Sequence, residues 1–326
     1  MREKLNQLGE SAMRRGAGSV GVIAAVGAAL CSGVAVAQER QWGVNRSIEQ
    51  ISEHVYRWGS DGQFGDYILT SEGIIVIDGH YCPSGTVAWL KGELAARHDV
   101  PVKYIVLSHD HQDHNCNSQL FSDTAVAVGH RNIVPHLVRE KRLSAIPQVT
   151  FEREMDLVLG GVTVTLLYFG PSHSDNLIHV HIPQDKVLIS IDVAREGLFP
   201  DLRDMDVHST LKQLKILANL EDVEIVVPGH GPRLLKQDSF MKTHAFLQAL
   251  HDQVLELMLA GRTLREIRRL VTMEEFRDTP GLANLLDPNI VTMYDFLYRY
   301  REPNERISEL EAVSCIENSS ACRTSD

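Results

Sequence analysis

Short apolar runs bounded by glycine, proline and aspartate alternate with helical patterns over the first two thirds of the chain. Val87, Leu90 and Leu94 recur at helical spacing within residues 84–98, and residues 130–141 form a second predicted helix. Runs rich in β-branched and aromatic residues predict strands at 55–58, 67–70, 74–77, 102–107, 125–128, 162–169, 177–182, 186–191 and 223–227. Strands that alternate with helices, followed by a second run of strands, predict an α/β fold of two sheets with helices outside.

The pattern changes to helices alone after residue 235. Leucines recur at helical spacing from Leu247 to Leu259, and further helical patterns cover residues 264–271 and 290–300. Such an apolar face predicts packing over one side of the sheets, and it could also line a substrate pocket or form a dimer contact. The predicted domains are a leader at 1–37, a catalytic domain at 38–235, a helical extension at 236–302 and a polar tail at 303–326.

Residues 1–37 have the pattern of an export signal. Arg14-Arg15 precede an uncharged apolar run from Val20 to Leu30, and Ala35-Val36-Ala37 offers the small residues at which such signals are cleaved. An uncleaved membrane anchor is the alternative, but the run is short for a span of about 20 residues. The sequence therefore predicts a bacterial protein that is periplasmic or secreted and has no stable membrane association after cleavage.

Composition and charge indicate which classes of molecule this protein can bind. Hydrophobic residues make up 44% and charged residues 23% of the chain, and the formal net charge is −11. An acidic surface repels nucleic acid and anionic membranes, so the predicted partner is a small-molecule substrate and not nucleic acid. Nothing in the pattern sets the number of subunits.

The cysteines do not show the spacing of a zinc finger. In an oxidising compartment Cys315 and Cys322 could close a small loop, and two unpaired thiols on the tail are an equal alternative. Cys116 follows the polar cluster described next, and we expect it to be a buried apolar thiol.

A dense polar cluster follows the apolar run of residues 104–107. Residues 108–114, Ser-His-Asp-His-Gln-Asp-His, hold three imidazoles and two carboxylates, each of which needs a partner if it is buried. His109 and His111 lie two apart, so on an extended segment they point to the same side and can bind one metal ion. Asp113 and His114 follow after a turn and can bind a second metal ion.

Further candidate ligands stand near the ends of later predicted strands. They are His173 within residues 170–176, Asp192 after the apolar run 187–191, and His230 in Pro-Gly-His-Gly. This order, H-x-H-x-D-H followed by a His, an Asp and a final His, resembles the metallo-β-lactamase superfamily over residues 66–231. Every metal position of that pattern is filled.

The resemblance implies an αββα sandwich with the site at the rim of the two sheets. It also implies that Asp78, at the end of a predicted strand, braces the metal loop. The implied first metal is held by His109, His111 and His173, the second by Asp113, His114 and His230, and Asp192 bridges the two.

Nitrogen and carboxylate ligands without cysteine favour two Zn²⁺ ions, with iron or manganese as alternatives. Two ions about 3.5 Å apart can share a water and lower its pKa toward neutrality, which generates a nucleophile. Asp113 is the predicted catalytic residue, because it can orient or deprotonate that water.

The predicted function is therefore that of an exported binuclear hydrolase that cleaves an acyl bond, a lactam or an ester. An Asp at position 192 resembles the glyoxalase II side of the superfamily more than the true β-lactamases. The segment from Pro228 through the helical extension resembles exported metallo-hydrolases that include the group linked to quinoprotein relay systems. One alternative is a thioesterase similar to hydroxyacylglutathione hydrolase. Two others are a non-heme iron oxidoreductase similar to persulfide dioxygenase, and a metal-binding relay protein without catalysis.

The remaining histidines lack this paired spacing. We expect surface positions or satisfied core positions for His54, His80, His98, His130, His136, His179, His181, His208, His244 and His251. Phe64 and the loop from Gly62 to Gly65 could form a flexible flap beside the metals, because glycine-rich turns at a sheet rim are mobile.

Overall fold

The computed structural model describes residues 42–300. The predicted leader at 1–37 lies outside the described residues, as do the tail at 303–326 and Cys315 and Cys322 within it. Among the residues that are described, no helix is long and apolar enough to cross a membrane.

One sheet has seven strands in sequential order. The first four strands are antiparallel neighbours, and the pairs β4–β5, β5–β6 and β6–β7 are parallel. Parallel neighbours need crossovers, which helices supply. The strands are β1 (Ser47–Gln50), β2 (Val55–Ser60), β3 (Gln63–Leu69), β4 (Ile74–Ile77), β5 (Val102–Leu107), β6 (Val126–His130) and β7 (Val149–Phe151).

The second sheet has five strands in the order β12-β11-β10-β9-β8. Its pairs are antiparallel except for β11 and β12, which run parallel. The strands are β8 (Glu154–Leu159), β9 (Val162–Leu167), β10 (His179–Ile182), β11 (Val187–Ile189) and β12 (Ile225–Val227).

The core between the sheets is built from their facing side chains. Ile77, Val106 and Val128 of the first sheet and Val164 and Ile189 of the second belong to one buried cluster. Full burial of each such side chain stabilises the fold by about 1.5–3 kcal/mol. The two sheets therefore form the inner layers of a sandwich.

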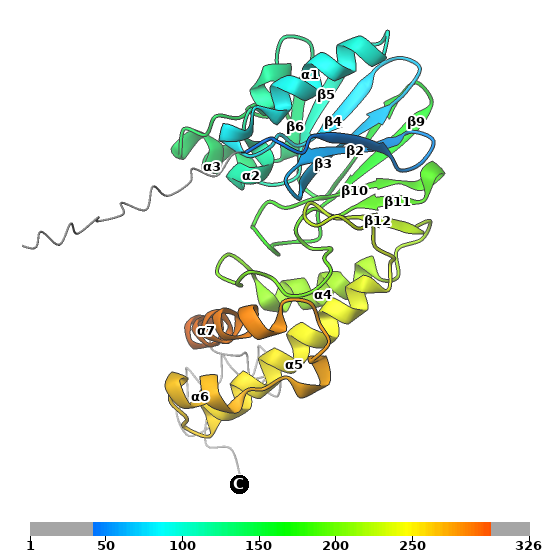
Figure 1. Ribbon diagram of the computed structural model, residues 1–326. Coiled ribbons are helices and arrows are strands. Elements are labelled where there is room, and N and C mark those ends of the chain that lie inside the picture. Colours follow the sequence, from blue (N-terminus) through cyan, green and yellow to red (C-terminus); the bar gives the residue numbers. More distant parts are fainter. Residues whose placement is uncertain (1–41, 301–326) are drawn as a thin grey trace, which may run out of the picture. The chain divides into compact units, whose positions relative to one another are not determined.

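Helices cover the outer face of the seven-stranded sheet. Leu90 and Leu94 of α1 (Thr86–Arg97) and Ile133 and Leu137 of α3 (Ile133–Arg139) pack in a cluster with Ile105 of β5. Figure 1 shows α1 and α3 beside β4–β6. Shorter turns connect these elements: η1 (Cys82–Ser84), α2 (Gln112–Asn115) and η2 (Ser118–Phe121).

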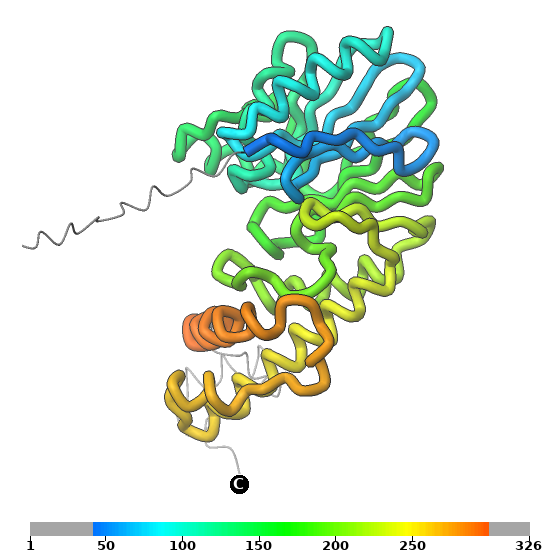
Figure 2. Tube along the Cα trace, viewed as in Figure 1, coloured from blue at the N-terminus to red at the C-terminus, as the bar shows by residue number. Residues whose placement is uncertain are grey.

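The outer face of the five-stranded sheet carries the C-terminal helices. Leu188 of β11 and Val226 of β12 share a cluster with Leu214 of α4, Leu250 of α5 and Met293 of α7. Figures 1 and 2 show the chain passing from β12 into α5 and on to α6 and α7. The remaining elements are η3 (Pro183–Asp185), α4 (Val207–Leu217), α5 (Ser239–Leu259), α6 (Leu264–Leu270), η4 (Glu274–Phe276) and α7 (Leu282–Tyr300).

The predicted αββα sandwich with a helical C-terminal part is confirmed. The sequence patterns did not predict β1, β7, β8 or α4. The carboxyl ends of β4, β5, β11 and β12 lead into the loops at one edge of the sandwich. Polar groups placed after parallel strands gather at such an edge.

Candidate metal centre

The seven side chains marked as ligands by the sequence meet at this edge. Each comes from a segment that follows a strand: His109, His111, Asp113 and His114 after β5, His173 after β9, Asp192 after β11 and His230 after β12. Their ligand atoms form two groups of four, and within each group these atoms lie within 4.8 Å of one another. The structure therefore brings all seven together.

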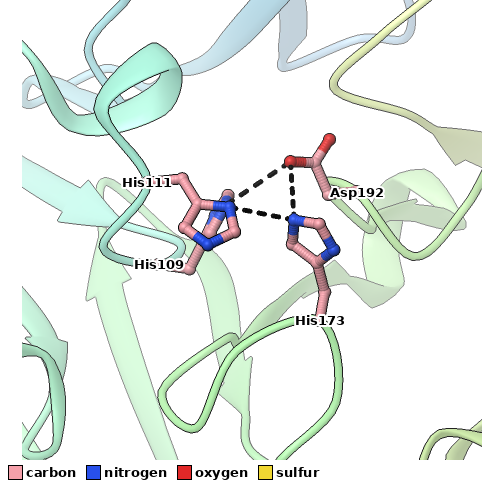
Figure 3. A group of neighbouring side chains, drawn as sticks. All are labelled: His109, His111, His173 and Asp192. Atoms are coloured by element: carbon pink, nitrogen blue, oxygen red, sulfur yellow. Dashed lines mark hydrogen bonds and ion pairs between the residues drawn. The ribbon is translucent and has the colours of Figure 1, made fainter. Parts of the chain in front are cut away.

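The first group contains three imidazoles and one carboxylate. Nε2 of His173 lies 2.9 Å from Nδ1 of His111, and Oδ2 of Asp192 lies 3.4 Å from Nε2 of both His109 and His173. Figure 3 shows His109 and His111, which share the loop after β5, pointing toward His173 and Asp192, which come from other loops. Such an arrangement directs four donor atoms at one point, as a tetrahedral ion requires.

The second group contains two imidazoles and two carboxylates. Nε2 of His230 lies 3.0 Å from Nε2 of His114 and 3.1 Å from Oδ1 of Asp192. Oδ2 of Asp113 lies 3.4 Å from Nε2 of His230. The side chains of Asp113 and His230 are each 36% exposed, so this group has a side open to solvent.

Asp192 belongs to both groups. Its Oδ2 lies 3.4 Å from Nε2 of His109 and of His173 and 3.3 Å from Nε2 of His114, and its Oδ1 lies 3.1 Å from Nε2 of His230. Its backbone has φ +58°, a left-handed conformation that Asp tolerates better than most residues and that turns the chain sharply after β11. This turn aims the carboxylate between the two groups, where it can bridge two ions.

Asp78 supports the loop that follows β5, as the resemblance to the superfamily implied. Its Oδ1 accepts from the Ser108 backbone at 2.7 Å and its Oδ2 from the Ser108 hydroxyl at 2.6 Å. The Ser108 oxygen lies 2.9 Å from Nδ1 of His109 and can accept its proton, because the hydroxyl donates to Asp78. That tautomer leaves Nε2 of His109 as a lone-pair donor facing the first group.

Burial and neighbouring charged groups shift the pKa values of the site residues in opposite directions. Burial acts to lower the pKa of His114, but Asp192 and Asp113 outweigh it and raise the pKa to about 10. Burial lowers the pKa of His109 to about 3, with Asp192 offsetting it only in part. Burial acts to raise the pKa of Asp192, yet His114 and His230 hold it well below its usual range. A metal ion would replace the proton on His114.

One buried atom supports the fit of a metal. His109 is fully buried, and its Nε2 faces the first group with no hydrogen-bond partner among the described residues. An unpaired buried polar atom costs about 1–3 kcal/mol, and a metal–nitrogen bond would offset that cost. The donor set of imidazole nitrogen and carboxylate oxygen suits zinc, and it is compatible with iron or manganese.

The other described histidines lie outside both groups. His54 pairs with Asp185 at 2.7 Å, and His136 pairs with Asp175 at 3.0 Å. His179, which alternates with His181 on β10, lies 2.9 Å from the Ser190 hydroxyl. The partners of these residues are the ones expected for core and surface histidines.

The expectation for Cys116 was right about its burial and wrong about its free thiol. Cys116 is buried, but it forms a disulfide with Cys82, and the Cα atoms are 5.1 Å apart. The bridge ties the residue two positions after His114 to the η1 turn. Two cysteines separated by 34 positions reveal no pairing in the sequence, because only the tertiary fold brings them together.

The turn from Gly62 to Gly65 is not the free flap that its glycines suggested. The amide of Phe64 donates to the carbonyl of Gly229 at 2.8 Å, and the amide of Gly231 donates to the carbonyl of Gly62 at 3.0 Å. These bonds hold the turn against the loop that carries His230.

Arg195 is a further candidate site residue, and no motif in the sequence marks it. Its guanidinium lies 4.7 Å from the centroid of the Phe199 ring, and its Nε is buried without a hydrogen-bond partner. Arg195 lines a cavity of about 670 Å³ whose other walls include Arg233 and the first turns of α5. These two arginines each stand three positions after a metal-group residue, Asp192 or His230. That spacing is the only sequence signal that could have singled them out.

Comparison with known proteins gives consistent matches. The family model of the metallo-β-lactamase superfamily matches residues 67–230. The chain is 23% identical over 203 residues to 2,4-dinitroanisole O-demethylase subunit alpha of Nocardioides sp., which is 61% of this chain and 61% of that relative. It is 22% identical over 197 residues to metallo-β-lactamase type 2 of Elizabethkingia meningoseptica, 56% of this chain and 78% of the relative. The chain thus spans less than two thirds of the demethylase subunit.

Solved structures show the same fold. The metallo-β-lactamase from Pontibacter korlensis superposes with a TM-score of 0.55 at 20% identity, over 63% of this chain and 99% of that one. The metallo-β-lactamase from Hirschia baltica superposes with a TM-score of 0.54 at 17% identity, over 62% and 98%.

Proposed function

Because the chain belongs to the metallo-β-lactamase superfamily, we propose that it is an exported metal-dependent hydrolase that cleaves an acyl bond, a lactam or an ester. The observation that carries this proposal is the pair of four-residue groups that share Asp192. Bound there, two ions would supply a Lewis acid and would lower the pKa of a water. We propose zinc as the metal, because imidazole and carboxylate donors suit it.

Asp113 is the residue that we propose as the proton acceptor. Burial acts to raise the pKa of Asp113, but His114 and the hydrogen bond from His230 outweigh it and hold the pKa well below its usual range. The carboxylate is therefore ionised at neutral pH. It also lies on the solvent side of the second group, where it can orient a water and receive its proton.

Arg195 is the residue that we propose for binding an anionic group of the substrate. Its buried Nε has no partner, and the cavity beside it is within the size range of small-ligand pockets. A carboxylate would satisfy the guanidinium in a bidentate pair. The cavity is lined by acidic as well as basic side chains and by none of the seven metal-group residues. The proposal therefore rests on Arg195, three positions after Asp192, and favours a small acyl compound with one anionic group.

Two features support export. The leader pattern at 1–37 is typical of a cleaved signal. The Cys82–Cys116 disulfide is independent of that pattern, and such bonds persist mainly in oxidising compartments. We therefore propose a periplasmic or secreted location.

A second candidate reaction comes from the relatives. Two of them are named as the alpha and beta subunits of a 2,4-dinitroanisole O-demethylase, at 23% and 25% identity. Cleavage of an activated aryl methyl ether is therefore the second proposal, and 2,4-dinitroanisole is its direct probe.

The test is a substrate panel with the zinc-loaded protein. The panel contains β-lactams, esters and lactones, a glutathione thioester and 2,4-dinitroanisole, each assayed with and without chelator. Asp113→Ala should lose nearly all turnover while leaving the fold intact. Asp123→Ala is the matched control, because Asp123 is an exposed carboxylate that pairs with Lys91.

The outcomes separate the candidates. Hydrolysis of a lactam or ester that needs metal and Asp113 supports the main proposal, and cleavage of the anisole alone would replace it with the second. Turnover of the thioester alone would favour a thioesterase. One bound iron with oxygen-dependent chemistry would favour an oxidoreductase, and no turnover with bound metal would favour a relay protein.

A further inference from the structure

We propose that the hairpin formed by β2 and β3, residues 55–69, is the positioning element of the second metal group. It fixes His230 and Asp113 and thereby sets the affinity of the second ion, while the first ion is supported by other residues. This inference rests on the proposed two-ion function and adds to it the residues that make the two sites independent.

The turn of the hairpin is paired through its backbone with the loop that carries His230. Gln63 and His230 form an antiparallel β-bridge. On either side of that bridge, the Phe64 amide donates to Gly229 at 2.8 Å and the Gly231 amide donates to Gly62 at 3.0 Å. The backbone of His230 is thus held from both sides by a segment about 170 residues away in sequence.

Arg57 adds a second set of bonds to the same loop. It is 2% exposed, and its Nη2 donates to the carbonyls of Pro228 at 3.0 Å and Gly231 at 2.7 Å. These carbonyls lie on either side of His230 in the chain. The guanidinium also stacks on Phe64, 3.7 Å from the ring centroid, so the cation is held in place from within the hairpin.

Gln63 connects the hairpin to Asp113, which like His114 and His230 belongs to the second group alone. Its side-chain amide donates to the backbone carbonyl of Asp113. Its own carbonyl lies 3.2 Å from Nε2 of the buried His80, which can donate to it. Gln63 is itself only 8% exposed. Gln63 therefore stands opposite His230 in the bridge, whose bonds its two neighbours make, and bonds to Asp113 through its own side chain.

The first group is supported by different residues. Gln213 of α4 is buried, and its amide donates to Gly170 at 3.0 Å and Pro171 at 2.8 Å, just before His173. His109 is held through Ser108. Among the described residues, the hydrogen bonds of the hairpin to the metal loops reach residues 228–231 and Asp113, and none of them reaches the loop of His173.

This division predicts that the two affinities can be changed separately. Residues that orient metal ligands from behind typically change metal affinity by about 10- to 100-fold when removed. Loss of a hairpin hydrogen bond should therefore lower the affinity for the second ion by about tenfold or more and leave the affinity for the first ion nearly unchanged. Loss of the Gln213 bonds should do the reverse.

The experiment measures stepwise Zn²⁺ binding by competition with a chromophoric chelator. The variants are Gln63→Ala, Arg57→Lys and Gln213→Ala in the full chain, with urea unfolding of each metal-free protein as a check on folding. Gln237→Ala is the matched control, because Gln237 also donates to two backbone carbonyls but lies before α5. Arg57→Lys keeps the positive charge but loses the Nη2 group that donates to both carbonyls. We expect it to weaken binding of the second ion less than Gln63→Ala does.

The results distinguish this inference from the function on which it rests. Selective weakening of the second step by Gln63→Ala, with both steps unchanged in Gln237→Ala, would support the inference. If the wild-type chain binds two ions and Gln63→Ala binds them equally well, the inference alone is overturned. Equal weakening of both steps by Gln63→Ala would overturn it as well. A wild-type chain that binds a single ion would overturn the two-ion function itself.

Discussion

Removal of the Cys82–Cys116 disulfide should lower the free energy of unfolding by about 4 kcal/mol. The bridge closes a loop over a sequence separation of 34 residues. In the chain-entropy account, closing a loop of that length removes about 13 cal/mol/K from the unfolded chain, which is about 4 kcal/mol at 25 °C. The closed loop contains α1, β5 and the segment from His109 to His114, so the lost stability falls on the part of the chain that carries four of the seven metal-group residues.

The assay is equilibrium urea unfolding of the metal-free wild type and the Cys82→Ala, Cys116→Ala double variant, followed by tryptophan fluorescence. Alkylation and peptide mass spectrometry, which report the thiol state of each cysteine separately, show whether the wild-type bridge is formed. A formed bridge whose removal costs less than about 1 kcal/mol would refute the reasoning. It would mean that the unfolded chain is already restricted in this region.

Three further predictions follow from contacts near the site. A Cβ on Gly229 would lie 2.8 Å from Cε1 of His114, which is closer than ordinary van der Waals contact. Gly229→Ala should therefore displace the His114 ring and lower kcat/KM by about tenfold or more. An unchanged kcat/KM would contradict this prediction. Burial raises the pKa of Asp66 to about 8, so the folded chain keeps its proton while the unfolded chain loses it above about pH 4. Wild-type stability is therefore lost as the pH rises toward 8, and the stability gain of Asp66→Asn in urea unfolding should grow from pH 5 to pH 8 and not stay constant. Arg195→Ala should raise KM for an anionic substrate and leave KM for a neutral analogue unchanged, and equal effects on both substrates would argue against its proposed role.

The local part of the site could be predicted from the sequence. His109 to His114 stand within six residues, directly after a buried strand, so spacing alone separates the pair that shares an extended segment from the pair that follows a turn. The structure shows that division, because His109 and His111 belong to one group and Asp113 and His114 to the other. Single residues such as Asp192 were recognisable because a polar side chain ended an apolar run.

Contacts between distant segments could not be predicted in this way. The hydrogen bonds from Arg57 to the loop around His230 span more than 170 positions, and nothing local marks Arg57 as their donor. The same limit applies to the glycine-rich turn before Phe64, whose composition predicts mobility although its bonds to the His230 loop hold it.

One missed helix did carry a local signal. The Asp206 side chain accepts a hydrogen bond from the Ser209 amide and caps α4, and Leu211 and Leu214 follow at helical spacing. β7 and β8, by contrast, are short or half-exposed, and their residues alternate too weakly to stand out. Their place in the fold is set by pairing with neighbouring strands.

The central claim is that seven side chains hold two metal ions around a shared Asp192. Crystals of the zinc-loaded protein, measured at the zinc absorption edge, test it directly through anomalous scattering. We expect two peaks a few ångströms apart, one among His109, His111 and His173 and one among Asp113, His114 and His230. A single peak, or peaks away from these side chains, would contradict it.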